Sequence, residues 1–288
     1  LGCGCTLCPS SCSSSSDVSG SAGGLRALCP RANAWMREAA ASNSAAAASA
    51  SGPGSTSTAQ CVGAVPVRCS CRISRVSGSA LAFLATRGFA VLSVNYRGST
   101  GFGKALLDSL PGNIGTQDVD DCLKAIEVCC STQNVDRDKV AVVGGSHGGF
   151  LGAHLVARAP KLFKACALRN PVTNLGAMVG SSDIPDWVAC ECASSGTPPG
   201  PEVLKKLFAM SPIAGIDAVE APVLLALGLK DRRVPPSQGL EYYHALQARG
   251  KAARLLTYPD DDHALDTPRT SADHWVEIAA FLEDRLLG

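Results

Sequence analysis

The chain has 288 residues, a formal net charge of +1, and a composition that is 46% hydrophobic and 18% charged. These values suit a water-soluble globular protein of one large domain or two small ones, with a sizeable core. The near-neutral charge argues against a nucleic-acid or anionic-membrane partner. No apolar run reaches the roughly 20 residues that span a bilayer, and no signal-peptide pattern opens the chain, so we do not expect a membrane protein.

The 14 cysteines divide the chain into two parts, with eight in the first quarter and six further on. The later six lie within or beside apolar segments, which is typical of buried, reduced thiols in an intracellular protein. The early run Cys3-x-Cys5-x-x-Cys8 lacks a second ligand pair at zinc spacing. We therefore predict no metal site and no cofactor.

Residues 1–75 are rich in Ser, Ala and Gly and contain few large apolar side chains. A segment of this composition cannot bury enough surface to offset its chain entropy, so we predict that it is disordered. Residues 76–288 carry regular hydrophobic patterns instead, and we predict that they form the folded domain.

Within this domain, short apolar runs alternate with helix-periodic segments. This alternation predicts β-α-β units and an α/β domain with a doubly wound, mainly parallel sheet. A glycine-rich loop is expected at 96–103, and a long irregular stretch at 171–201 suits a substrate pocket. The expected helices are 79–87, 118–130, 150–159, 236–248 and 270–287, and the expected strands are 89–95, 140–143, 164–168, 221–227 and 253–258.

The motif Gly144-x-Ser146-x-Gly148 lies between an expected strand and an expected helix. That context is typical of a nucleophile elbow, a turn that holds a serine in a strained conformation. The residues two before and two after the serine must then be small, and the N–H groups that open the helix can face an oxyanion. The alternative is a glycine-rich turn whose serine merely caps the helix.

A serine nucleophile needs a histidine base and an acid that orients it, and after an elbow serine the acid precedes the histidine. Of the five histidines, His263 alone lies in a loop that follows an expected strand. We predict His263 as the base and Asp231, which follows the 221–227 strand, as the acid. The separations are 231 − 146 = 85 and 263 − 231 = 32 residues, which leave room for β-α units.

Two groups of aspartates compete with Asp231. Residues 260–262 are too close in sequence to His263 to align its imidazole easily, and they suit solvation or capping of the turn. Asp118, Asp120 and Asp121 precede the strand of the serine. Their expected role is charge and capping at a helix N-terminus.

Six segments of the chain match a known family: residues 95–103, 144–149, 169–171, 182–187, 231–235 and 258–263. They include the runs Gly-Gly-Ser-His-Gly-Gly and Ser-Asp-Ile-Pro-Asp-Trp. These segments resemble the prolyl oligopeptidase family of serine peptidases, and within it the acylaminoacyl-peptidase branch. The resemblance extends from about Leu81 to the C-terminus.

The resemblance implies an α/β-hydrolase fold and a cytoplasmic serine peptidase. Such an enzyme releases the N-acylated, for example acetylated, amino acid from a short peptide through an acyl-enzyme. Ser146 would be the nucleophile, His263 the base and Asp231 its orienting acid, while the backbone N–H of His147 would donate to the oxyanion. The family pattern also assigns Arg233 and Val234 to the substrate site, with a loop ion pair as the alternative for Arg233.

The sequence departs from the family in two respects. A seven-bladed β-propeller and a His-Gly-Gly-Pro segment precede the matching region in the family, and neither occurs here. Residues 63–66 occupy roughly the position of the His-Gly-Gly-Pro segment. The hydrolase domain is therefore expected to be incomplete on its N-terminal side. Loss of one oxyanion donor costs about 100- to 1000-fold in kcat. Two alternatives to an acylaminoacyl peptidase therefore remain: a general serine esterase or oligopeptidase of the same fold, and a truncated inactive relative. The sequence leaves open whether the chain forms a homo-oligomer.

Overall fold

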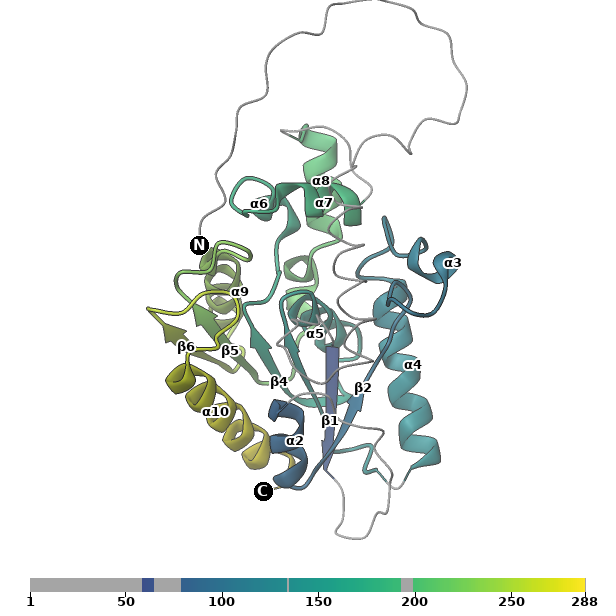
Figure 1. The fold of residues 1–288 in the computed structure, drawn as a ribbon, viewed down its shortest axis with the longest axis vertical. Helices are drawn as coiled ribbons and strands as arrows, with labels where there is room; N and C mark the ends of the chain where they lie inside the picture. The colour runs from purple at the N-terminus through teal and green to yellow at the C-terminus, as the bar shows by residue number, and fades with distance from the viewer. Residues whose placement is uncertain (1–58, 65–78, 134, 193–198, 288) are drawn as a thin grey trace, which may run out of the picture.

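The computed structural model describes residues 59–64, 79–133, 135–192 and 199–287. A sheet with the strand order β2-β1-β3-β4-β5-β6 lies at its centre (Figure 1). β3 to β6 pair in parallel, whereas β1 is antiparallel to both of its neighbours. The expected mainly parallel sheet is therefore confirmed. The strands are β1 Ala59–Ala64, β2 Phe89–Ser93, β3 Val140–Gly145, β4 Phe163–Arg169, β5 Val223–Gly228 and β6 Ala253–Tyr258.

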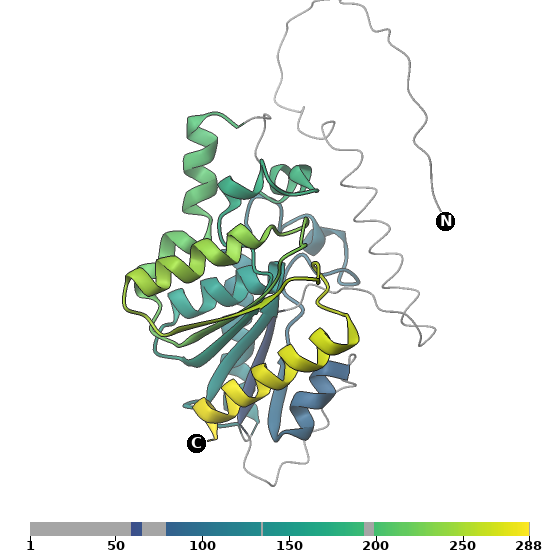
Figure 2. The ribbon, with the colours of Figure 1, turned by 90° about the vertical axis from the view of Figure 1, so that its left-hand side faces the viewer.

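Helices cover both faces of this sheet (Figure 2). One face packs against α2 (Ser79–Thr86) and α10 (Pro268–Leu286). The other packs against α4 (Gln117–Thr132), α5 (His147–Arg158) and α9 (Pro236–Ala248). The arrangement is a three-layer α/β domain, as the alternation of strands and helices predicts.

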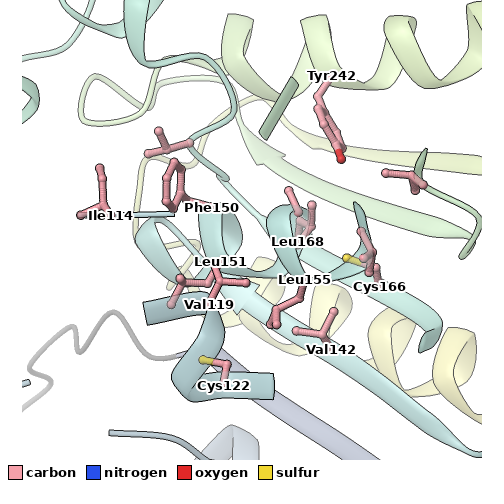
Figure 3. Close-up of a cluster of buried hydrophobic side chains, with 14 of the residues drawn as sticks. Ile114, Val119, Cys122, Val142, Phe150, Leu151, Leu155, Cys166, Leu168 and Tyr242 are labelled. Atoms are coloured by element: carbon pink, nitrogen blue, oxygen red, sulfur yellow. The ribbon is translucent and has the colours of Figure 1, made fainter. Parts of the chain in front are cut away.

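The strands supply both layers of the core because successive side chains of a strand point to opposite faces. Val140 and Val142 join the cluster under α4, α5 and α9. Ala141 and Val143 join the cluster under α2 and α10. Figure 3 shows the first cluster, in which the fully buried Leu151 of α5 lies among residues of α4 and of the strands. The helix that follows Ser146 is thus anchored along its length.

The stretch 171–201, predicted to be irregular, contains two short helices, so that prediction is wrong in part. They are α6 (Leu175–Met178) and α7 (Pro185–Glu191), and α8 (Pro201–Ala209) begins at its end. Asn174 caps α6 by accepting the Ala177 N–H at 3.2 Å. Proline occupies the first helical position of α7 and α8, where its fixed φ suits a helix. Figure 1 shows all three beyond the upper end of the sheet. The remaining short segments are α3 (Lys104–Leu107) and a 3-10 helix at Pro212–Ala218.

β1 lies inside the segment that was expected to be disordered, and for these six residues the structure differs from that expectation. Gln60 to Ala64 pair with β2, and Ala59 to Gly63 pair with β3. Two flanking strands thus decide the conformation of a segment whose composition carries no strand pattern. The rest of residues 1–75, including the Cys3–Cys8 run, lies outside the described residues.

Candidate active site

Ser146 sits at the sharp turn between β3 and α5. Its φ of 57° and ψ of −120° are strained for a residue with a side chain. A Cβ at Gly144 would collide with the carbonyl oxygen of Gly148, so the turn closes only around glycine. The Ser146 side chain makes no capping hydrogen bond to α5. The turn therefore has the backbone geometry of a nucleophile elbow, and the Ser146 side chain does not cap the helix.

The structure brings Asp231 and His263 together, although 32 residues separate them. Asp231 Oδ2 lies 2.6 Å from His263 Nδ1. Asp231 Oδ1 accepts the backbone N–H groups of Arg233 at 2.8 Å and Val234 at 2.9 Å. The Asp231 side chain is fully buried, whereas 27% of the His263 side chain is exposed. A carboxylate acceptor favours the tautomer with a proton on Nδ1, which leaves Nε2 unprotonated, as a general base requires.

Two groups at the elbow lack a hydrogen-bond partner within the described ranges. They are the hydroxyl of Ser146 and the backbone N–H of His147, which opens α5. A helix N-terminus presents such N–H groups to an anion, and its dipole favours negative charge there. Catalytic hydrogen bonds are often long in an unliganded site and shorten when substrate binds. The elbow thus holds an available hydroxyl beside an available backbone N–H.

The loop after His263 is held by Asp261, one of the aspartates that the sequence offers as an alternative to Asp231. Asp261 accepts the N–H of Thr267 at 3.2 Å and its hydroxyl at 2.8 Å, and it also accepts the Thr270 hydroxyl. These bonds lower the pKa of the Asp261 carboxyl against the opposing effect of desolvation. Asp260 pairs with Lys230 in solvent. Asp261 thus ties the loop to the start of α10, while Asp260 lies in solvent at the turn, as expected.

The predicted substrate residues lie beside the acid. Val234 is buried, and its N–H bonds to Asp231. Arg233 forms an ion pair with Asp183, with Nε 2.7 Å from Oδ1. The Ser182 hydroxyl donates to the Arg233 carbonyl at 2.7 Å. The Ser-Asp-Ile-Pro-Asp-Trp segment thus docks on the loop of the acid, and the ion pair that was the alternative for Arg233 is present.

The sequence did not predict a buried polar cluster behind the elbow, which contains His147 and Asp118. The imidazole of His147 lies against Phe150, Tyr96 and Trp187, with ring centroids 5.2, 5.8 and 6.0 Å away. Its Nε2 lies 3.4 Å from Oδ2 of Asp118, which is fully buried. Asp118 lies in the first turn of α4, as expected, and its Oδ1 accepts the N–H of Val119 at 3.0 Å, but its burial beside His147 was not predicted. A carboxylate in the first turn of a helix usually stays in solvent, so no local pattern distinguishes this one.

Three residues other than glycine have positive φ in the part of the chain that the structure describes: Ser146, Asn170 and Leu265. All three lie at the carboxyl-end edge of the sheet, one in the elbow, one after β4 and one after His263. Backbone strain of this kind persists only where surrounding contacts hold it, and it clusters at functional sites. The sequence signalled only the first of the three.

The described ranges contain no group of three or more His, Cys, Asp and Glu side chains that could hold a metal ion. The helices in those ranges are too short or too polar to cross a membrane.

Comparison with known proteins places this site in a family. The sequence profile of the prolyl oligopeptidase family matches residues 74–287. The mouse acylamino-acid-releasing enzyme is 48% identical over 208 residues, which cover 71% of this chain and 28% of the mouse protein. The chain thus spans just over a quarter of the length of that relative.

Two solved structures share the fold. An acylaminoacyl peptidase from Pyrococcus horikoshii matches with a TM-score of 0.65 and 26% identity, over 70% of this chain and 33% of that one. A puromycin-hydrolyzing peptidase from Mycobacterium tuberculosis matches with a TM-score of 0.66 and 25% identity, over 72% and 31%. The expected α/β-hydrolase fold is therefore confirmed.

Proposed function

The chain belongs to the prolyl oligopeptidase family, and we propose that it is a serine peptidase that releases an N-acylated amino acid from a short peptide. The observation that carries this proposal is the 2.6 Å contact between Asp231 and His263 at the sheet edge that also holds the elbow of Ser146. The substrate class is supported by the mouse relative, whose name describes that reaction.

In the proposed reaction, Ser146 Oγ attacks the carbonyl carbon of the acylated first residue. His263 Nε2 takes the hydroxyl proton, and the backbone N–H of His147 donates to the oxyanion. The C–N bond then breaks, and His263 passes the proton to the leaving amine. A water molecule, deprotonated by His263, attacks the acyl-enzyme and releases the acylated amino acid and free Ser146.

We propose that Arg233 and Val234 line the substrate site. The Val234 N–H bonds Asp231, and the Arg233 side chain pairs with Asp183, so both residues lie beside the acid. Arg233→Ala should raise KM while kcat stays nearly constant, because a binding contact of this kind acts equally on substrate and transition state. A fall in kcat at constant KM would oppose this assignment.

The proposal also places the protein in the cytoplasm, as the resemblance implies. Of the six cysteines that the sequence predicts to be mostly buried, reduced thiols, three are buried in the core (Cys122, Cys166 and Cys192) and three are partly exposed (Cys129, Cys130 and Cys190). Burial raises the pKa of the Cys122 thiol to about 12, which keeps it protonated and unreactive. Cell fractionation with an antibody to the chain would test the location.

The test of function is fluorophosphonate labelling of the purified chain, with circular dichroism to confirm folding. Labelling should disappear in Ser146→Ala and in His263→Ala. It should persist in His244→Ala, a matched control on the exposed face of α9. A folded wild-type chain that does not label would identify it as an inactive relative.

Substrate class is tested next, by comparing acetyl-alanyl p-nitroanilide with a short p-nitrophenyl ester. Hydrolysis of the acyl-amino-acid amide supports the proposal. Hydrolysis of the ester alone would favour a general esterase. The similarity to a puromycin-hydrolyzing peptidase makes puromycin a third substrate worth including.

A further inference from the structure

Asn170 lies at the end of β4, between the strand of the nucleophile and the strand of the acid. Asn170 is 2% exposed, and its φ is +40°. Asparagine is one of the few residues besides glycine that tolerate this left-handed region. The backbone alone would therefore accept glycine here, so the side chain needs its own explanation.

Three hydrogen bonds of that side chain join two parts of the site. Asn170 Oδ1 accepts the N–H of Gly228 at 2.9 Å, at the end of β5 and three residues before Asp231. Asn170 Nδ2 donates to the carbonyl oxygens of His263 at 3.0 Å and Asp262 at 3.3 Å. A single buried amide thus links the strand of the acid to the loop of the base.

The neighbouring residue extends the link to the nucleophile. The N–H of Ser146 donates to the carbonyl of Arg169 at 3.0 Å. The guanidinium of Arg169 donates to the carbonyl of Ala264 at 3.0 Å and lies over the ring of Trp275, 5.0 Å from its centroid. Residues 169 and 170 therefore contact the elbow on one side and the loop of His263 on the other.

The loop of the base also rests directly on the end of β5. A Cβ at Gly228 would lie 2.8 Å from the carbonyl oxygen of Asp261 and closer still to that of Asp262. Glycine thus permits the close approach, and Asn170 bonds the two segments where they meet. A shift of this loop would move the His263 imidazole relative to both Asp231 and Ser146.

We propose that Asn170 is a positioning residue, whose amide fixes the His263 backbone so that the imidazole is aligned between acid and nucleophile. This role rests on the proposed function, because it concerns the base of that reaction. Misplacement of a catalytic group by about 1 Å costs roughly 100-fold in rate. Loss of the amide should therefore reduce turnover more than substrate binding or stability.

The main test is Asn170→Gly in the full chain, since glycine keeps the left-handed backbone and removes all three bonds. We expect kcat to fall roughly 100-fold and KM to stay within about twofold. The rate of fluorophosphonate labelling should fall in parallel. Wild-type kcat and labelling in this variant would overturn the proposal, since the residue would then serve the backbone alone.

Asn170→Asp is the second variant, assayed at pH 8. It retains an acceptor for Gly228, but an ionised carboxylate cannot donate to the carbonyl of His263. We expect a similar loss of kcat and an upward shift of the acidic limb of the kcat/KM profile, because a nearby negative charge favours protonated imidazole. Asn113→Gly is the control: the side chain of this exposed asparagine donates only to the Ser109 carbonyl, and its loss should leave kcat unchanged.

A readout independent of turnover separates this proposal from the proposed function. The Nδ1–H of His263, bonded to Asp231, should give a downfield NMR resonance in the chain labelled with 15N-histidine. The resonance should broaden or vanish in Asn170→Gly and persist in Asn113→Gly. If wild type shows it but cleaves no acyl-amino-acid substrate, the proposed function fails alone. If Asn170→Gly retains it at full intensity, the positioning role fails.

Discussion

Two aspartate–histidine pairs flank the elbow, and they differ in how well they are satisfied. In the first, His263 Nδ1 lies 2.6 Å from Asp231, whose other oxygen accepts two backbone N–H groups. In the second, His147 Nε2 lies 3.4 Å from Asp118, and no hydrogen bond within the described residues satisfies Asp118 Oδ2 or either ring nitrogen of His147.

Their surroundings differ as well. His263 keeps 27% of its side chain exposed, at the edge where substrate would arrive, while the His147 side chain is 9% exposed among aromatic rings. The two pairs thus differ in hydrogen bonding and in exposure, and on these grounds we propose a catalytic role for the first pair alone. A histidine that acts as a general base needs an oriented partner and an accessible, unprotonated ring nitrogen, and only the first pair supplies both.

The largest expected effect comes from Asp231→Asn. The amide should favour the wrong tautomer of His263, and kcat should fall by about 10⁴-fold with little change in KM. Steady-state kinetics with acetyl-alanyl p-nitroanilide measure it. Asp260→Asn is the matched control, since that carboxylate is 90% exposed and only pairs with Lys230. Equal kcat and KM values in the two variants would mean that Asp231 contributes no more to the reaction than an exposed aspartate does.

Gly144→Ala should damage the elbow that both pairs share. The new Cβ would meet the Gly148 carbonyl, which cannot move without shifting α5. We expect a loss of about 1–3 kcal/mol in the free energy of unfolding, measured by urea denaturation, and no fluorophosphonate labelling. In Gly145→Ala the nearest atom is 3.6 Å away, so its stability should change far less. A larger loss of stability in Gly145→Ala than in Gly144→Ala would contradict the packing of the turn.

A pH experiment probes the buried side of the elbow helix. Burial lowers the pKa of His154, next to Phe150, from 6.5 to about 4. The unfolded chain therefore binds a proton that the folded chain excludes between pH 6.5 and about 4. Stability is highest above pH 6.5 and falls as pH drops through that window, by up to about 1.4 kcal/mol per unit from this residue.

Urea unfolding from pH 7 to pH 4.5 measures this effect. His154→Gln should flatten the slope, because glutamine can still donate to the Met210 carbonyl that His154 Nε2 contacts at 3.1 Å. His244→Gln, on the exposed face of α9, should leave the slope unchanged. An unchanged slope in His154→Gln would mean that the folded state also protonates this histidine.

The smallest expected effect is that of Asp118→Asn, the counterpart of Asp231→Asn in the second pair. Asp118 Oδ2 has no hydrogen bond to lose within the described residues, and an amide removes a buried charge while keeping the shape. Stability should change by less than about 1 kcal/mol and kcat by less than about tenfold. A loss as large as that of Asp231→Asn would show that the second pair also acts in catalysis.

Much of the site could be predicted because its signals are local. The elbow requires glycine two residues before and two after Ser146, and the strand-loop position of Asp231 and His263 follows from short hydrophobic runs. Asn170 lies in one of the segments that resemble the family, but neither Asn170 nor Asp118 carries a local pattern that predicts its role. Their roles depend on partners far along the chain: 58 and 93 residues separate Asn170 from Gly228 and His263. No periodicity or spacing encodes contacts of that kind.

The fold divides in the same way. The sequence by itself determined the mainly parallel α/β domain, because strand and helix periodicities are properties of consecutive residues. The chain order of the proposed nucleophile, acid and base was likewise predicted from the sequence. Only the tertiary structure decided that Ala59–Ala64 become a strand, since pairing on both sides forms it. Tertiary structure alone also decided that the Asn170 amide bonds Gly228, Asp262 and His263, because hydrogen-bond geometry and burial arise only when distant segments pack together.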